Sequence, residues 1–98
     1  MKKRVAEIKN WYLDDYMNVL HGNVYGRIGF EDGTPVRTSA IFKVTKVPNG
    51  EFLVETHNTI YTCSFEDNRN SYSTIDELWE MLQKVASREQ EGLFKCFA

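Results

Sequence analysis

Residues 20–28 alternate between apolar and polar side chains, the pattern of a strand with one face buried. The apolar positions are Leu20, Val24 and Ile28, and the polar positions are His21, Asn23, Tyr25 and Arg27. A second alternating segment covers residues 36–45, after the turn signal Asp32-Gly33. Its polar positions are Arg37, Ser39, Lys43 and Thr45, and Ile41 alone falls out of phase. We expect these two segments to be neighbouring strands.

Further strands are expected on both sides of this pair. Residues 4–13 ("RVAEIKNWYL") are rich in aromatic and β-branched residues, which favours a strand, although apolar residues at helical spacing leave a helix as the alternative. The segment "VPNGEF" predicts a hairpin in which Gly50 supplies a positive φ angle. Residues 52–56 then continue as a strand, and "TIYTCSF" returns as another.

The last quarter of the chain predicts a helix. Thr74 is a favourable N-cap, and Glu77 three residues later completes a capping-box pattern. An apolar stripe of period 3.6 follows, formed by Ile75, Leu78, Trp79, Leu82, Val85 and Ala86. Gly92 is expected to end or follow this helix.

These elements predict a single domain of the α+β class over residues 1–98. The chain is 42% hydrophobic and 13% aromatic, a composition typical of a globular protein. We expect a small antiparallel β-meander or partly open barrel of four or five strands, with one amphipathic C-terminal helix packed on it.

The polar positions of the two alternating strands predict a binding surface. It comprises His21, Asn23, Tyr25, Arg27, Arg37, Ser39 and Lys43. Guanidinium forks beside an aromatic ring and hydroxyl groups suit a phosphate, a nucleotide or an acidic patch on a protein. The alternative is that these residues are only the solvated side of a two-layer fold. Gly22, Gly26 and Gly29 additionally predict strong curvature, a bulge or a close approach of backbone in this region.

Charge and cysteine content narrow the classes of partner and compartment. The net charge of −2 argues against a partner that needs a broad positive field, such as duplex DNA. Cys63 and Cys96 lack the spacing of zinc ligands, and Cys63 is expected to be a core thiol. No apolar run approaches the length of a membrane span, and the N-terminus lacks the apolar core of a signal peptide. A soluble cytoplasmic protein with reduced thiols is expected.

Catalysis, cofactors and metals are not expected. His21, Asp32 and Ser39 lack an activating motif for nucleophilic chemistry, and His21 and His57 lack the spacing of a metal pair. The adjacent carboxylates of Asp14 and Asp15 would point to opposite faces of a strand, so they are poor candidates for an acid/base pair. "DGTP" lacks the Gly-Lys-Ser/Thr ending of a phosphate loop.

The first half of the chain, "IKNWYLDDYMNVLHGNVYGRIGFEDGTPVRTSAI", resembles small proteins of bacteriophages and integrated elements of Gram-positive bacteria. In that pattern a Trp strand precedes "GxVxG", a "DGT" turn and "TS" followed by an aliphatic residue. The matching residues here are Trp11, Gly22, Val24, Gly26, Asp32, Gly33, Thr34, Thr38, Ser39 and Ile41. The resemblance implies a factor that acts by binding a component of the host, such as part of a defence system.

Three functional hypotheses follow. The leading one is a non-catalytic binding protein that blocks or sequesters a host protein, or takes a small phosphorylated ligand, through the predicted polar surface. The second is binding of single-stranded nucleic acid, with Tyr25, Phe30, Tyr61 and the two arginines as stacking and phosphate contacts. The third is a homodimer or higher homo-oligomer that uses the aromatic residues near Trp11 and the C-terminal tail as its interface.

Overall fold

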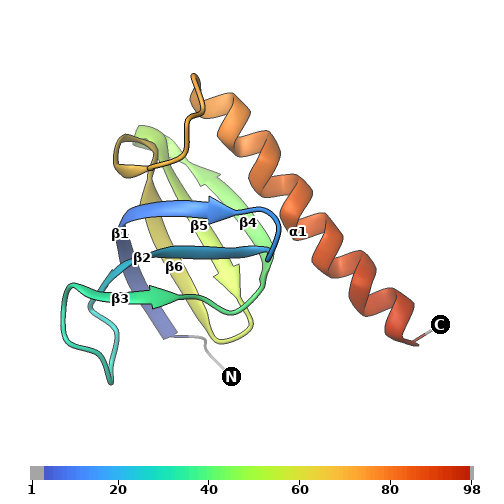
Figure 1. The fold of residues 1–98 in the computed structure, drawn as a ribbon, viewed down its shortest axis with the longest axis horizontal. Coiled ribbons are helices and arrows are strands. Elements are labelled where there is room, and N and C mark those ends of the chain that lie inside the picture. The colour runs from blue at the N-terminus through green and yellow to red at the C-terminus, as the bar shows by residue number, and fades with distance from the viewer. Residues whose placement is uncertain (1–3, 98) are drawn as a thin grey trace.

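The chain forms a six-stranded mixed sheet and one long C-terminal helix (Figure 1). This computed structural model describes residues 4–97, and the side chains of residues 4–90. The elements are β1 (Arg4–Asp14), β2 (Val19–Tyr25), β3 (Thr34–Arg37), β4 (Ile41–Val47), β5 (Glu51–Thr56), β6 (Thr59–Ser64) and α1 (Ile75–Phe97). The expected α+β class is confirmed, but the sheet has six strands where four or five were expected.

The sheet joins two antiparallel meanders of three strands each. Its order is β3-β2-β1-β6-β5-β4, and the meanders meet where β1 runs parallel to β6, with Arg4 opposite Thr59 and Glu7 opposite Thr62. The expectation of a wholly antiparallel sheet is therefore wrong at this contact. A parallel pair requires a long connection, and here the connection consists of the four intervening strands.

The predicted strand over residues 36–45 is divided into β3 and β4, which lie at opposite edges of the sheet. Thr38 interrupts it, because its N–H donates to the Leu20 carbonyl (2.9 Å) and its Oγ1 accepts from the Leu20 N–H (3.0 Å). Ile41 then donates its N–H to the Asn18 carbonyl (2.8 Å). The out-of-phase Ile41 thus marks the start of a new strand.

This short crossing requires the sheet to curl. Only residues 38–40 separate the two edge strands in the chain, and the four Cα–Cα steps across them span at most about 14 Å. The edges must therefore approach each other, and Figure 1 shows β1, β2 and β3 lying across β4, β5 and β6. The curl places the concave side of the sheet around the core.

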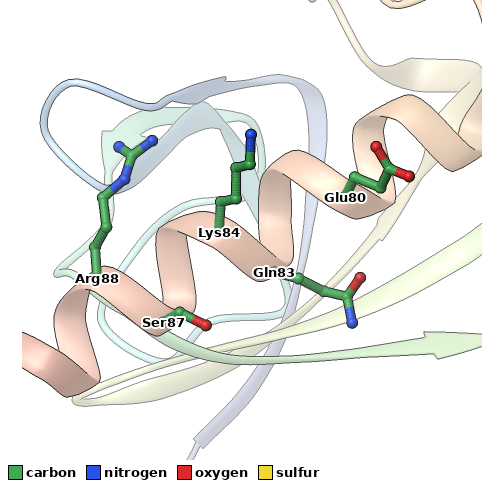
Figure 2. Close-up of a pocket in the computed structure, with 5 residues that line it drawn as sticks. All are labelled: Glu80, Gln83, Lys84, Ser87 and Arg88. Atoms are coloured by element: carbon green, nitrogen blue, oxygen red, sulfur yellow. The ribbon is translucent and has the colours of Figure 1, made fainter.

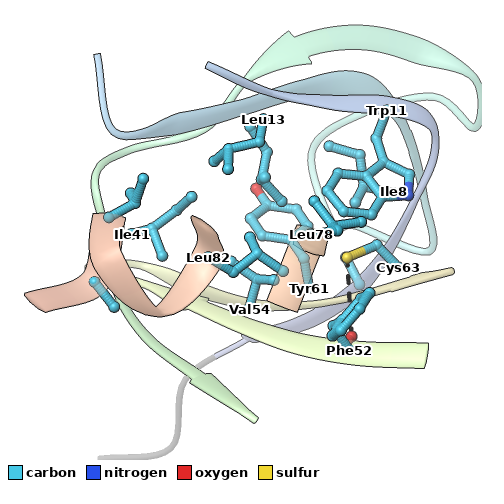
Figure 3. Packing of buried hydrophobic residues seen from close by; sticks show 14 of the residues in the cluster. Ile8, Trp11, Leu13, Ile41, Phe52, Val54, Tyr61, Cys63, Leu78 and Leu82 are labelled. Carbon is cyan, nitrogen blue, oxygen red and sulfur yellow. Dashed lines mark hydrogen bonds between the residues drawn. The ribbon is translucent and has the colours of Figure 1, made fainter. Parts of the chain in front are cut away.

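The core lies between the curled sheet and α1 (Figure 3). Trp11 is fully buried, meets Phe52 edge-on at 6.5 Å between ring centroids, and donates its indole N–H to the Ser64 carbonyl (2.8 Å). Cys63 lies in this core as expected, with its Sγ 3.9 Å from the Phe52 carbonyl oxygen. Burial raises the pKa of the Cys63 thiol, so the thiol stays protonated. Cys96 lies outside the described side chains.

Residues 4–13 form a strand, so the helical alternative is excluded. The strand is irregular at Asn10, whose φ is 50°, and its register against β2 shifts between Lys9 and Tyr12. Beyond this bulge the side chain of Asn70 binds the backbone of Leu13 as a neighbouring strand would. Its Oδ1 accepts from the Leu13 N–H (2.7 Å) and its Nδ2 donates to the Leu13 carbonyl (3.1 Å), which satisfies backbone groups that would otherwise lack a ladder.

The helix α1 covers the open side of the sheet along β4 (Figure 1). Thr74 caps it as predicted, since its Oγ1 accepts the Glu77 N–H (3.2 Å), while the Glu77 carboxylate accepts the N–H of Ser73 (3.4 Å). Trp79 stacks on Phe52 at 5.9 Å between ring centroids. The expected end at Gly92 is wrong, because the helix continues to Phe97. Within the described part of the chain, no helix combines the length and apolar character that a membrane span requires.

Candidate functional site

The predicted binding residues are distributed over two faces and both edges of the sheet. His21 pairs with Arg37 across β2 and β3, so this part of the predicted neighbourhood is confirmed. Lys43 lies instead on β4, which pairs only with β5 at the opposite edge. The cause is the crossing at residues 38–40, which carries the second alternating segment away from β2. Lys43 is not among the residues that line the pocket where Arg27 and Arg37 meet.

Tyr25 and Arg27 also diverge. The Tyr25 ring lies under the ammonium of Lys9, 5.0 Å from the ring centroid, on the outer face of the sheet. Arg27 follows β2 in the loop and extends toward the concave side, where its Nε donates to the Tyr61 hydroxyl (3.3 Å). The change of direction coincides with Gly26, whose φ of 73° ends the alternation of the strand.

The outer face carries a compact cluster around His21. The His21 ring stacks on Tyr12 at 4.7 Å between centroids, and its Nε2 lies 3.1 Å from Asp14 Oδ2. The guanidinium of Arg69 lies 5.5 Å from the Tyr12 ring centroid. Asn23 donates its Nδ2 to the Gly33 carbonyl (2.9 Å). His21 and Asn23 thus each have a hydrogen-bond partner within the fold.

Asp14 makes part of this cluster sensitive to acid. The Met17 backbone N–H donates to its Oδ1 (3.0 Å), and this bond, followed by the contact with His21, lowers the pKa of the Asp14 carboxyl. A lowered folded-state pKa means that the stabilising contribution is present above about pH 4 and is lost as pH falls through the lowered value. In denaturant unfolding, the stability difference between wild type and Asp14→Asn should be larger at pH 7 than at pH 3. An equal difference at both pH values would contradict this assignment.

Arg27, Arg37 and Ser39 meet at a pocket lined by residues of both meanders, which we call the Arg27 pocket. Its volume is about 320 Å³. It is lined by Arg27, Phe30, Val36, Arg37, Thr38, Ser39, Thr56, Asn58, Thr59 and Tyr61. The loop after β2, the end of β3 and the β5–β6 turn contribute to it, so segments from both meanders form one site.

The Arg27 pocket contains hydrogen-bonding capacity that the fold does not use. Besides its bond to Tyr61, the Arg27 guanidinium lies over the Phe30 ring, 5.0 Å from its centroid. Its Nη1 is shielded from solvent and has no hydrogen-bond partner among the described residues, and the same is true of Thr59 Oγ1. Thr59 itself is fully buried. Unpartnered buried polar groups are costly, so these two atoms indicate a place where a bound group can supply the missing partners.

The electrostatic character of the Arg27 pocket is positive. Two guanidinium groups line it, and none of its described lining residues is an Asp or Glu. Guanidinium is charged at all physiological pH values and matches carboxylate and phosphate oxygens in geometry. The chemistry that these side chains support is the binding of an anion.

Two other features do not form a comparable site. Within the described residues, no group of three or more His, Cys, Asp or Glu side chains is placed to hold a metal ion. A larger hollow lies on α1 and is lined by Glu80, Gln83, Lys84, Ser87 and Arg88 (Figure 2). All of these residues come from one helix and are exposed, so the hollow is a solvated helix surface and not a cleft between elements.

The residues named in the nucleic-acid and oligomer hypotheses do not lie together as those hypotheses expected. Tyr61 is only 4% exposed and belongs to the core, while Tyr25 lies on the outer face, so these rings do not form one stacking surface with Phe30. Trp11 is fully buried and is not available to an oligomer interface. Tyr16, by contrast, is 91% exposed in the β1–β2 turn.

Sequence reasoning missed Asn58 and Thr59 as lining residues. They lie in the segment "HNTIYT", which shows only a turn followed by a strand, and no motif distinguishes them. Their approach to Arg27 depends on the curl of the sheet. Comparison of the chain with family models, with curated proteins and with solved structures found no match.

Proposed function

We propose that this is a non-catalytic binding protein that captures a partner carrying an anionic group at the Arg27 pocket. The observation that carries the proposal is the partly buried Arg27 guanidinium, whose Nη1 has no partner among the described residues, beside a second guanidinium from Arg37. Desolvated Arg–anion contacts are stronger than those at an open surface, because the surrounding dielectric is lower.

The loop between β2 and β3 supports contact with a protein. Ile28 is 79% exposed and Phe30 is 44% exposed, and both lie next to Arg27 in this loop. Exposed apolar side chains that adjoin a charged pocket are typical of an interaction surface. Gly26 and Gly29 adopt positive φ angles of 73° and 94°, which gives the loop a shape that holds Arg27 at the pocket while Ile28 faces solvent.

The partner that we propose is a cytoplasmic component of a bacterial host. The support for this is the resemblance of the first half of the chain to small proteins of bacteriophages and integrated elements. Among the residues that carry this resemblance, Thr38 and Ser39 line the Arg27 pocket. A factor of this kind acts by occupying or withholding its target, which needs a binding site and no catalytic group.

Affinity capture tests the proposal. Immobilised wild type, the double variant Arg27→Ala/Arg37→Ala and the control Lys43→Ala are incubated with lysate of a Gram-positive bacterium, and captured proteins are quantified by mass spectrometry. We expect the double variant to retain at least about tenfold less of the specific partner, since charge-assisted hydrogen bonds are lost. Lys43→Ala should retain it, because Lys43 does not line the Arg27 pocket.

Thermal unfolding of the same three proteins provides the folding control. The double variant should remain folded, with a melting temperature within about 4 °C of wild type, because its free energy of unfolding should fall by less than about 1 kcal/mol. Equal capture by wild type and the double variant, or no specific capture by wild type, would remove the Arg27 pocket as the binding site.

A further inference from the structure

The residues that line the Arg27 pocket carry more hydrogen-bond donors than a single carboxylate can use. Arg27 Nη1 and Thr59 Oγ1 are unpartnered among the described residues. Arg37, Ser39 and Asn58 line the same pocket and add a guanidinium, a hydroxyl and a carboxamide. Together these residues offer at least five donor groups to a ligand. A carboxylate has two oxygens, whereas a phosphate monoester has three terminal oxygens that accept hydrogen bonds.

The charge of the Arg27 pocket leads to the same ligand. Two guanidinium groups line it without an acidic neighbour among the described lining residues. A carboxylate or a phosphate diester carries one negative charge, whereas a phosphate monoester carries about −1.5 to −2 at pH 7. The monoester is therefore the group that balances both arginines.

The size of the Arg27 pocket and the aromatic ring at its rim limit what the rest of the ligand can be. The volume of about 320 Å³ is at the lower end of the range for small-molecule sites. It accommodates a phosphate together with one ring-sized organic group. Phe30 lies at the rim, where it is 44% exposed, and offers an apolar contact to that group.

We infer that the Arg27 pocket binds a phosphate monoester, with Arg27 and Thr59 as the inner donors and Arg37 as the second positive charge. The inference rests on the proposed function and specifies the anionic group that the partner presents. Thr59 is a specificity residue in this arrangement, because its buried hydroxyl is satisfied only when a ligand oxygen reaches it.

Isothermal titration with defined probes tests the inference on the full chain. The probes are phenyl phosphate, the diester methyl phenyl phosphate and benzoate, all at pH 7.5. We expect phenyl phosphate to bind at least tenfold more tightly than either singly charged probe. Equal or tighter binding of benzoate or of the diester would overturn the inference, as would an absence of phenyl phosphate binding.

Three variants identify the donors. Arg27→Ala and Thr59→Val should each weaken phenyl phosphate binding by about tenfold or more, since each loses a hydrogen bond to a charged group. Valine has the shape of threonine without the hydroxyl, and Thr59 Oγ1 has no partner in the described fold, so Thr59→Val should melt no lower than wild type. Lys43→Ala should change the affinity less than twofold. Unchanged affinity in Arg27→Ala or in the folded Thr59→Val protein would overturn the assignment.

Two comparisons complete the experiment. A peptide with one phosphoserine that binds more tightly than phenyl phosphate would identify a phosphorylated protein as the source of the monoester, and one that binds no more tightly would identify a free small ligand. If Arg27-dependent capture of a partner persists while no monoester binds or competes, the inference fails and the proposed function stands. If capture is independent of Arg27 as well, both fail.

Discussion

Replacing Trp11 by alanine is expected to remove most of the free energy of unfolding of the protein at room temperature. Trp11 is fully buried, packs edge-on against Phe52 and donates its indole N–H to the Ser64 carbonyl. Large-to-small substitutions of buried aromatic residues cost about 3–5 kcal/mol. The total free energy of unfolding of a small domain is roughly 5–15 kcal/mol, and a domain of this size is expected near the lower end of that range. Urea unfolding followed by circular dichroism measures the loss.

Trp11→Phe separates packing from hydrogen bonding at this position. It keeps an aromatic ring in the core but leaves the Ser64 carbonyl without its donor, so we expect a loss of about 1–3 kcal/mol, smaller than that of the alanine variant. If Trp11→Ala instead unfolded at nearly the wild-type urea concentration, Trp11 could not lie at the centre of the core.

Gly22→Ala is expected to destabilise the protein by about 1–3 kcal/mol, a large effect for the addition of one methyl group. A Cβ atom at Gly22 would lie 2.8 Å from Ile8 Cγ1, 2.9 Å from the Lys9 carbonyl oxygen and 3.0 Å from Trp11 Cβ. The Lys9 oxygen is backbone and cannot rotate away, so β1 and β2 would have to separate at the bulge. Chemical unfolding measures the change, and wild-type stability in this variant would show that the strands do not approach so closely.

Local pattern predicted the elements that depend on neighbouring residues. The alternation in residues 20–28 gave β2, and the capping pattern at Thr74 gave the start of α1, because both signals depend on side chains a few positions apart. The division between β3 and β4 also left a local trace in the out-of-phase Ile41. The prediction treated that residue as an exception within one strand, since alternation alone does not show that Thr38 binds Leu20.

Sheet order could not be predicted in the same way. The parallel contact between β1 and β6 joins Arg4 to Thr59, and no local signal encodes a pairing over that separation. Trp11, which the third hypothesis placed near an oligomer interface, lies in the core. An aromatic residue on a strand is equally consistent with an interface or a core until the neighbours of that strand are known.

The candidate site was predicted only in part, because some of its residues come together through tertiary contacts that local pattern does not show. Arg27, Arg37 and Ser39 stood out because charged and hydroxyl side chains broke an apolar pattern, and the curl of the sheet does bring them to one pocket. Lys43 followed the same sequence pattern, but it does not line the Arg27 pocket. Asn58 and Thr59 complete the Arg27 pocket from the second meander, and their contribution depends on a tertiary contact that only the folded chain contains.

The central claim is that the Arg27 guanidinium binds a phosphate monoester in the Arg27 pocket, and NMR of that side chain tests it most directly. In a ¹H–¹⁵N spectrum the Arg27 Nε–Hε signal is followed while phenyl phosphate is added, with Arg27→Ala used to assign the signal. We predict a progressive, saturating shift of this signal, accompanied by the backbone amides of Ser39 and Thr59. An Arg27 signal that stays in place, with or without shifts elsewhere in the protein, would contradict the account.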